Sequence, residues 1–318
     1  MDDNKQSQLI SDKNLPPTSP PTLSADASIQ AALGLFETHM RDEGFSINTV
    51  KAFASDIRLL GKFVGIGQPV GEIGTKDLND FMLWIENGRD ANISCSPKTY
   101  ARRVTTVKVF FGWLHKTGVL ADNPSAAIIQ RTVKTPLPTL PSEEDIGKAL
   151  AVTSAIYNGE AEGKADTRPH LLLTLLLQTG IKKSEAMAII PNHIDDSDAN
   201  EPLLFIRYAN PRLRYKERKL YLQPEWITVF DAYLQEYKPT DTLFTCTARN
   251  LEYVLSDVTE AAGLAKGSLS FENLRWISAL RDWNAEVEQD EIRQKLGLSK
   301  ITWRETRSKL KQLTENNN

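Results

Sequence analysis

Four prolines fall within the segment from Val119 to Pro141, and this segment constrains the fold more than any other feature of the sequence. They are Pro124, Pro136, Pro138 and Pro141. Proline lacks a backbone N–H and breaks a helix, so a segment with several prolines and little hydrophobic periodicity favours extended chain. The length of 318 residues also suggests roughly two domains of about 150 residues each. We therefore predict two domains, joined by a linker at residues 121–140.

The segment before the linker, residues 28–120, has helical periodicity throughout. In "IQAALGLFETHM" apolar residues recur at i, i+3, i+4 and i+7 from Ile29, the pattern of an amphipathic helix. Three further helices are predicted to begin at the caps Ser46, Thr75 and Ser96, because hydroxyl side chains accept hydrogen bonds from the first turn. Four helices would make one small all-α domain. Residues 1–27 are polar and proline-rich, which predicts a disordered tail.

Residues 141–318 are predicted to form a second, mostly helical domain. Its first helix begins near Ser142, whose spacing to Asp145 is close to that of a capping box. The segment "PLLFIRYANPRLRYKERKLYLQP" departs from this pattern, because two runs of strand-forming residues flank a turn and predict a β-hairpin. The predicted fold class is therefore mainly α, with a small hairpin or sheet in the second domain.

Composition excludes several classes of protein. The two cysteines, Cys95 and Cys246, lie far apart, which excludes a disulfide framework and the usual spacing of metal ligands. No apolar run reaches the roughly 18 residues of a membrane span, and the polar N-terminus has no signal-peptide core. We expect a soluble cytoplasmic, nucleoid-associated protein without a metal, a cofactor or a membrane partner. The net charge of −3 does not by itself indicate nucleic acid.

The distribution of charge is more informative than the net charge. On the last helix of the first domain the residues opposite the apolar stripe carry only positive charges, and they are Lys98, Arg102, Arg103, Lys108 and Lys116. In the hairpin only Glu217 offsets six cations, which are Arg207, Arg212, Arg214, Lys216, Arg218 and Lys219. Solvated faces usually mix both signs, whereas unmixed basic faces are typical of phosphate contacts. We therefore predict that both elements bind duplex DNA, through Lys98, Arg102, Arg103, Lys108, Arg212, Arg214 and Lys216.

The order of these segments resembles the tyrosine recombinases, or phage integrases, from Ser28 to about Lys311. The first domain is similar to the helical core-binding domain of that family. In the second domain, "TGIKKSE" resembles the T-G-x-R-x-x-E segment, and "RYKERKLYL" resembles the family's β-hairpin. "FENLR" is similar to the H-x-L-R helix, and "LGL" with the helix after it is similar to the L-G-H segment and the nucleophile helix. The sequential set is more specific than any one motif.

The resemblance implies a chemistry at the scissile phosphate. A tyrosine attacks it and forms a covalent 3′-phosphotyrosyl link. Two arginines stabilise the pentacoordinate phosphate, a hairpin lysine protonates the leaving oxygen, and histidines assist. Family members assemble as tetramers on DNA, so the resemblance also implies an oligomer of this chain on DNA.

This sequence departs from the family at most catalytic positions. Lys182 stands at the first arginine, Glu272 at the first histidine, Leu298 at the second histidine and Arg307 at the tyrosine. The second arginine of the family is present here as Arg275, which is also predicted to contact DNA. The candidate hairpin lysine is Lys216, although strict spacing points to Leu213. The last tyrosine of the chain and all four histidines precede "FENLR", so a small alignment slip cannot supply a nucleophile.

These departures predict a DNA-binding regulator or accessory factor that has lost strand cleavage. An active recombinase with an atypical nucleophile, or one supplied in trans, is the alternative, and a helical protein-interaction module is a third. Thr306 and Ser308 are hydroxyls near the vacant position. Two local questions stay open. Glu272 either pairs with Arg275 or lies on a solvated helix surface, and Arg307 either binds phosphate or is solvated.

Overall fold

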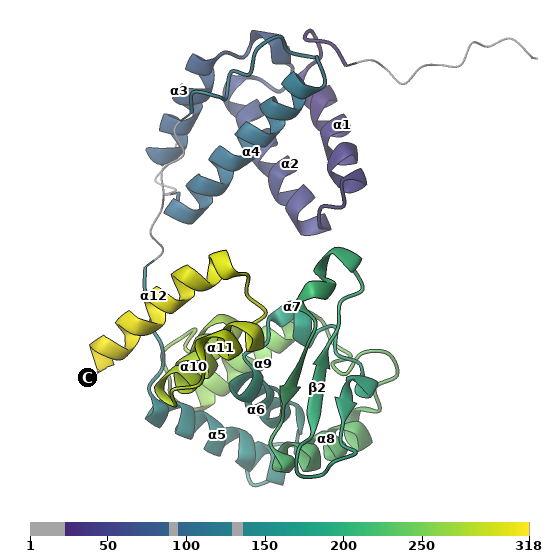
Figure 1. Cartoon of the computed structure of the whole chain (residues 1–318), viewed down its shortest axis with the longest axis vertical. Coiled ribbons are helices and arrows are strands. Elements are labelled where there is room, and N and C mark those ends of the chain that lie inside the picture. Colours follow the sequence, from purple (N-terminus) through teal and green to yellow (C-terminus); the bar gives the residue numbers. More distant parts are fainter. Residues whose placement is uncertain (1–22, 89–94, 129–135, 318) are drawn as a thin grey trace, which may run out of the picture. The chain divides into compact units, whose positions relative to one another are not determined.

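The computed structural model describes residues 23–88, 95–128 and 136–317. The chain divides into two compact units, Met1–Thr135 and Pro136–Asn318, and each is described by itself (Figure 1). Most of the predicted tail lies outside the described residues. Its last part does not: Leu23 and Ala25 pack against the core of the first unit, and the N–H of Gly71 donates to Ala25 O at 2.8 Å. The fold of the first unit therefore begins before residue 28.

The first unit contains four α-helices and one short 3₁₀-helix among its described residues. They are α1 (Ile29–Asp42), α2 (Ile47–Val64), η1 (Val70–Glu72), α3 (Thr75–Glu86) and α4 (Pro97–Lys116). The predicted caps Ser46 and Ser96 accept hydrogen bonds from the first turns of α2 and α4. The prediction for Thr75 was wrong: Gly74 caps α3, with Asp77 accepting from its N–H at 2.8 Å. Thr75 instead donates its hydroxyl to Pro124 O at 2.9 Å.

The core of the first unit lies between its helices. The predicted apolar stripe of α4 is confirmed, since Val104 and Leu114 are fully buried. The segment after α4 adds to this core, with Ile128 4% exposed and Ser125 fully buried. The first unit therefore extends to at least Ile128, because part of the segment predicted to be a linker has apolar residues that pack. Residues 129–135 lie outside the described residues.

The second unit surrounds the apolar helix α6. Its helices are α5 (Glu143–Asn158), α6 (Arg168–Thr179), α7 (Lys183–Ala186), η2 (Pro191–His193), η3 (Pro211–Lys216), α8 (Pro224–Tyr237), α9 (Ala248–Ala261), α10 (Phe271–Asn284), α11 (Gln289–Lys295) and α12 (Lys300–Asn317). Helices α5, α8, α9 and α10 all contact α6, and its leucines are buried almost completely. The predicted capping box is confirmed: Ser142 Oγ accepts from Asp145 N, and the Asp145 carboxylate accepts from Ser142 N, both at 3.1 Å.

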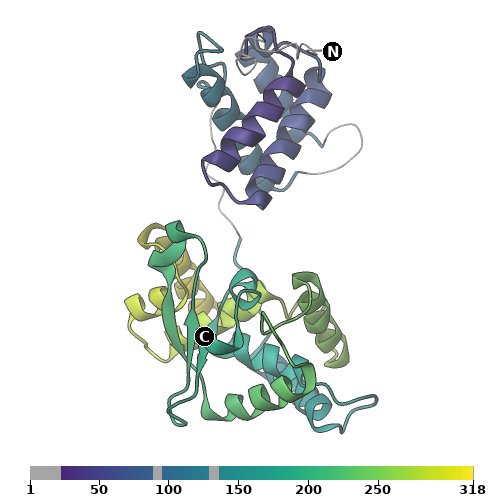
Figure 2. The same cartoon turned by 90° about the vertical axis from the view of Figure 1, so that its right-hand side faces the viewer.

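A three-stranded antiparallel sheet lies at one side of the second unit (Figure 2). It has the order β1 (Ile194–Asp195), β2 (Leu203–Ile206) and β3 (Arg218–Tyr221). The β2–β3 pair, with Leu203 opposite Tyr221, confirms the predicted hairpin, and η3 forms its connection. The predicted fold class, mainly α with a small sheet, is confirmed. Across the described ranges, no helix combines the length and apolarity that crossing a bilayer requires.

Candidate functional site

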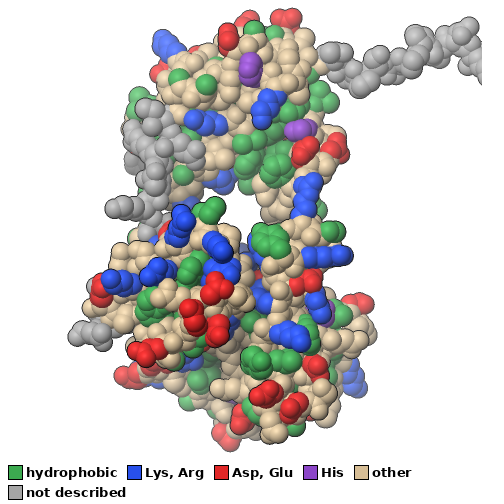
Figure 3. Space-filling model, viewed as in Figure 1, with side chains coloured by type: hydrophobic (Ala, Val, Ile, Leu, Met, Phe, Trp, Pro, Cys, Tyr) green, Lys and Arg blue, Asp and Glu red, His purple; other side chains and the backbone are tan. Residues whose placement is uncertain are grey.

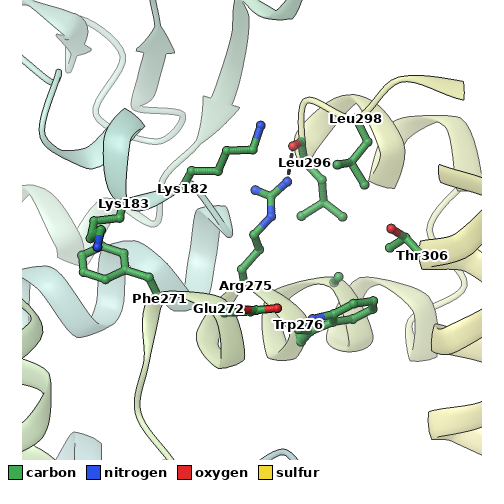
Figure 4. A pocket seen from close by; sticks show the side chains of 10 residues that line it. Lys182, Lys183, Phe271, Glu272, Arg275, Trp276, Leu296, Leu298 and Thr306 are labelled. Carbon is green, nitrogen blue, oxygen red and sulfur yellow. Dashed lines mark hydrogen bonds between the residues drawn. The ribbon is translucent and has the colours of Figure 1, made fainter. Parts of the chain in front are cut away.

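A cavity of about 350 Å³ in the second unit brings together most of the positions identified by motif (Figure 4). It lies among the α6–α7 connection, α10, the α11–α12 connection and α12. Its lining residues are Lys182, Lys183, Phe271, Glu272, Arg275, Trp276, Ala279, Leu296, Leu298 and Thr306. Lys182, Glu272, Arg275 and Leu298 therefore share one site, as their motif order predicts. Arg307 is exposed and does not line the cavity; Thr306, one residue earlier on α12, does.

Arg275 is fixed by the backbone on both sides. Its guanidinium donates to Gly180 O and to Leu296 O, and burial lowers its pKa to about 10. Gly180 can offer its carbonyl there because it ends α6 with a φ of +57°, and a Cβ at that position would lie 3.1 Å from Ser278 Oγ. Arg275 therefore joins the end of α6 to the turn after α11, while some of its N–H groups remain for a ligand.

Glu272 does not pair with Arg275, which answers one question left by the sequence. Glu272 is exposed and lies beside α10, away from the guanidinium (Figure 4). Among the described residues it forms no ion pair. The opposite charge that does act on Arg275 is Glu185. Glu272 thus places an anionic group at the rim of the cavity without neutralising its arginine.

Glu185 is the buried anion of this region, with 1% of its side chain exposed. Arg218 donates to it through two bonds, Nη1 to Oε1 at 3.1 Å and Nη2 to Oε2 at 3.0 Å. The N–H of Lys182 donates to Oε2 at 2.8 Å, and the hydroxyl of Tyr208 donates to Oε1. Burial by itself would raise the pKa of Glu185, but these hydrogen bonds and the charge of Arg218 lower it to about 2. Glu185 is therefore an anion at neutral pH.

Arg218 is one of the six hairpin cations predicted from the sequence, but its side chain is buried and is used inside the protein. Its side chain is 8% exposed, and its Nε donates to Lys295 O at 2.7 Å. A Cβ at Gly297 would lie 2.8 Å from Arg218 Nη1, so the glycine leaves room for the guanidinium. Arg207 pairs with Glu217 at 3.2 Å. Of the six hairpin cations, these two are used to hold the hairpin, while Arg212 and Arg214 lie exposed on η3.

Lys182 is surrounded mainly by other cations. Burial lowers its pKa, and Arg275, Lys216 and Arg218 lower it further, while Glu185, 3.9 Å away, opposes them. Figure 4 shows its side chain extended toward the guanidinium of Arg275. Within the described ranges neither Arg275 nor Lys216 forms an ion pair. Lys182 and Arg275 line the cavity, and Lys216 and Arg218 act on Lys182 from outside its lining. These cations outnumber the buried Glu185 and the exposed Glu272 at the rim.

The basic face of α4 in the first unit also needs correction. Asp56 on α2, with 4% of its side chain exposed, pairs with Arg102 and lies 3.5 Å from Arg103 Nε. Thr106 donates to the same carboxylate at 3.0 Å. Burial raises the pKa of Asp56 although both arginines lower it. The face is therefore not purely basic, because a neighbouring helix supplies an anion to two of its cations.

The remaining cations of α4 keep their predicted exposure. Lys98 and Lys116 are exposed, and Lys108 is half-buried. None of the three pairs with a carboxylate of the described ranges. In the second unit, Lys and Arg side chains lie over α12 and over the β2–β3 connection, with Asp and Glu side chains beside them (Figure 3). DNA contact by these residues stays a prediction.

Two buried carboxylates, Glu185 and Asp56, were not predicted from the sequence as functional or structural residues. Glu185 was visible as the last letter of "TGIKKSE", so its position in the motif was the signal for a role. Asp56 had no such signal, because its partners follow about 46 residues later on another helix. Only the packing of α2 against α4 brings them together.

Sequence comparison supports the family in both units. A model of the phage integrase N-terminal SAM-like domain matches residues 33–119. The chain is 27% identical over 178 residues to tyrosine recombinase XerC of Mycobacterium sp. (strain JLS), covering 55% of this chain and 57% of the relative. It is 28% identical over 150 residues to tyrosine recombinase XerD of Agrobacterium fabrum (strain C58 / ATCC 33970), covering 46% and 44%. The aligned regions thus span about half the length of these relatives.

Solved structures share the fold. A lambda integrase dimer bound to a COC′ core site has a TM-score of 0.64 at 16% identity, over 89% of this chain and 78% of that chain. XerH site-specific recombinase, in a post-cleavage complex with a palindromic difH substrate, has a TM-score of 0.66 at 16% identity, over 94% and 97%. The matching first domain, the sequence relatives and the shared fold together make this chain similar to the tyrosine recombinases, or phage integrases.

Proposed function

We propose that this protein binds duplex DNA and does not cleave it, and that it acts as a regulator or accessory factor. One observation carries the proposal: Lys182 and Arg275 line one cavity, and Lys216 and Arg218 lie near enough to lower the pKa of Lys182. Glu185 is the buried counter-charge beside them. Concentrated positive charge of this kind favours a phosphate group. The DNA complexes of lambda integrase and XerH, which share the fold, support DNA as the ligand.

The lining of the cavity supports the loss of cleavage. Leu298 offers carbon where the family pattern has a histidine, and the guanidinium of Arg307 stays protonated and is not a nucleophile. The hydroxyl that lines the cavity belongs to Thr306, and it donates to Thr302 O at 3.2 Å. Activation of an alcohol requires an adjacent base, and no histidine is among the described residues that line the cavity. The site retains charge to hold a phosphate but lacks an activated nucleophile.

A cleavage assay tests the proposal directly. Duplexes that bind the protein are first selected from a random library, and the selected site is then offered as a nicked suicide substrate. We expect saturable duplex binding that weakens steeply with salt, and no SDS-stable protein–DNA band. A wild-type band that Thr306→Val abolishes would instead establish an active recombinase with an unusual nucleophile. Absence of any saturable duplex binding at moderate salt would refute DNA binding itself.

The charge of Lys182 gives a second test, through pH. The pKa of Lys182 is lowered in the free protein, and a bound phosphate would raise it. Above the lowered pKa, binding of DNA should therefore be accompanied by uptake of a proton on Lys182. DNA affinity is therefore expected to fall as pH rises through the lowered pKa of Lys182. Lys182→Arg keeps its charge at all these pH values, so its affinity should stay flatter as pH rises toward the ordinary pKa of lysine.

Binding titrations across pH and salt measure this effect. Lys182→Gln should lower the slope of log affinity against log salt by about one. Lys148→Gln is the control, because Lys148 is an exposed lysine of α5 paired with Glu144 at 2.8 Å. If Lys182→Arg and wild type have the same pH profile, Lys182 does not contact the bound phosphate.

A further inference from the structure

The connection between β2 and β3 is an exposed tip that forms a helix of its own. Its helix η3 spans six residues, longer than most 3₁₀-helices. Asn210 caps it by accepting from Arg212 N at 3.0 Å, and Pro211 fixes its first turn. At its other end the N–H of Glu217 donates to Arg214 O at 2.9 Å. The conformation of the tip is therefore set by its own backbone and cap.

The base of this tip is braced to the rest of the unit. The Glu217 carboxylate accepts from Tyr208 N at 3.0 Å and pairs with Arg207. Tyr208 and Arg218, one on each side of the hairpin, both bind the buried Glu185. The base of η3 is thus tied to Glu185, next to the segment that carries Lys182.

Tyr215 is the conspicuous side chain of the tip. It is 73% exposed, although an aromatic ring of this size is normally covered at least in part. Lys216 Nζ lies 5.3 Å from the centre of its ring, so one face of the ring meets a cation. No other aromatic ring of the described residues stacks on Tyr215. Its opposite face is open to a ligand.

The neighbours of Tyr215 indicate the kind of ligand. Side chains at i and i+3 eclipse in a 3₁₀-helix, so Arg212 and Tyr215 lie on the same side of η3. Lys216, which meets the ring of Tyr215, also acts electrostatically on Lys182. An aromatic ring therefore lies beside cations that suit phosphate, one of which is near enough to act on Lys182 in the cavity. Nucleic acid combines phosphates with flat aromatic bases in this way.

We propose that Tyr215 stacks on an unstacked nucleobase beside the phosphate held at the cavity, so that the protein prefers DNA with a locally unpaired base. The inference rests on the proposed binding of DNA. In an intact duplex both faces of a base are covered by its neighbours, so the ring of Tyr215 has no face to meet. A bulge, gap or mismatch exposes one. Stacking on a single base typically changes affinity by about fivefold to a hundredfold.

The test compares two DNAs that differ at one nucleotide. One is the selected duplex. The other is the same duplex with a single bulged 2-aminopurine, prepared as a series in which the bulge lies at a different position in each member. Wild type and Tyr215→Phe are expected to bind the bulged DNA at its best position at least about fivefold more tightly than the duplex. Both should also quench the fluorescence of the 2-aminopurine. Tyr215→Leu should lose the preference and the quenching but keep its affinity for intact duplex within about twofold.

Tyr221 offers a matched control on the same hairpin. It is 71% exposed but lies on β3, away from η3, so Tyr221→Leu should behave as wild type. If Tyr215→Leu keeps both the bulge preference and the quenching, the inference is wrong while DNA binding stands. If wild type shows no preference for a bulge at any position, the inference is likewise wrong. If wild type binds neither DNA, the proposed function fails with it.

Discussion

Replacing Glu185 with glutamine is expected to lower the free energy of unfolding of the second unit by about 3 kcal/mol. The amide keeps the size of the side chain and one acceptor oxygen. It removes the charge that faces Arg218, whose side chain is 8% exposed and whose neighbours include Lys182 and Arg275. It also turns an N–H₂ group toward the donors of Arg218. A buried guanidinium without a counter-charge, close to other cations, is the costly result.

Urea unfolding followed by circular dichroism measures the change. The two units are expected to unfold in separable steps, and only the step of the second unit should shift. Glu252→Gln is the control: Glu252 pairs with Lys183 on the surface, and both side chains are more than two-fifths exposed. Such pairs contribute at most about 1 kcal/mol. Equal, small effects for both variants would show that Glu185 is not the anion that holds the hairpin.

The same residue predicts a dependence on acid. The pKa of Glu185 falls from its ordinary 4.5 to about 2 on folding. A carboxylate with a lowered pKa contributes its full stabilisation of the folded state at pH values above its ordinary pKa. This stabilisation is lost as pH falls from there through about 2. Wild type should therefore lose stability between about pH 5 and pH 2, and Glu185→Gln should lose less over that window. Parallel curves would contradict the assignment.

The sequence predicted local features of the fold well, for a physical reason. Helices such as α4 and the β2–β3 hairpin leave a period in the order of apolar residues, because one face of each packs against the core. The gathering of Lys182, Glu272, Arg275 and Leu298 followed from the order of motifs that share a fold. These signals are local, or are carried by a known order of elements.

What the sequence could not predict is which charges pair across elements. Arg218 and Arg102 were counted as solvent-facing cations, yet each binds a carboxylate on a distant segment. The assignment of Arg307 to the tyrosine position, made by counting residues along the helix, depended on the exact alignment for another reason. Successive residues of a helix differ by about 100° in direction, so a shift of one residue decides whether Arg307 or Thr306 faces the cavity. Tertiary packing settles both questions, and neither leaves a periodic trace.

The pairing of Asp56 changes what a test of the α4 arginines can show. Asp56→Ala is expected to lower the free energy of unfolding of the first unit by about 2 kcal/mol. Burial already disfavours the charged form of Asp56, so most of the loss should come from Arg103, whose side chain is 12% exposed and would lose its carboxylate. Arg103→Ala should therefore destabilise more than Arg102→Ala, whose side chain is 39% exposed.

Glu37 supplies the matched control, because it also pairs with two arginines, Arg41 at 3.1 Å and Arg58 at 2.6 Å. Both of these arginines are more than half exposed, so Glu37→Ala should cost at most about 1 kcal/mol. Equal losses for Asp56→Ala and Glu37→Ala in urea unfolding would contradict a structural role for Asp56. If the difference is found, weakened DNA binding by Arg102→Ala with Arg103→Ala reports damage to the fold as well as lost phosphate contacts. Lys98→Gln then becomes the cleaner probe of this helix, since Lys98 is exposed and its loss leaves no described carboxylate unpaired.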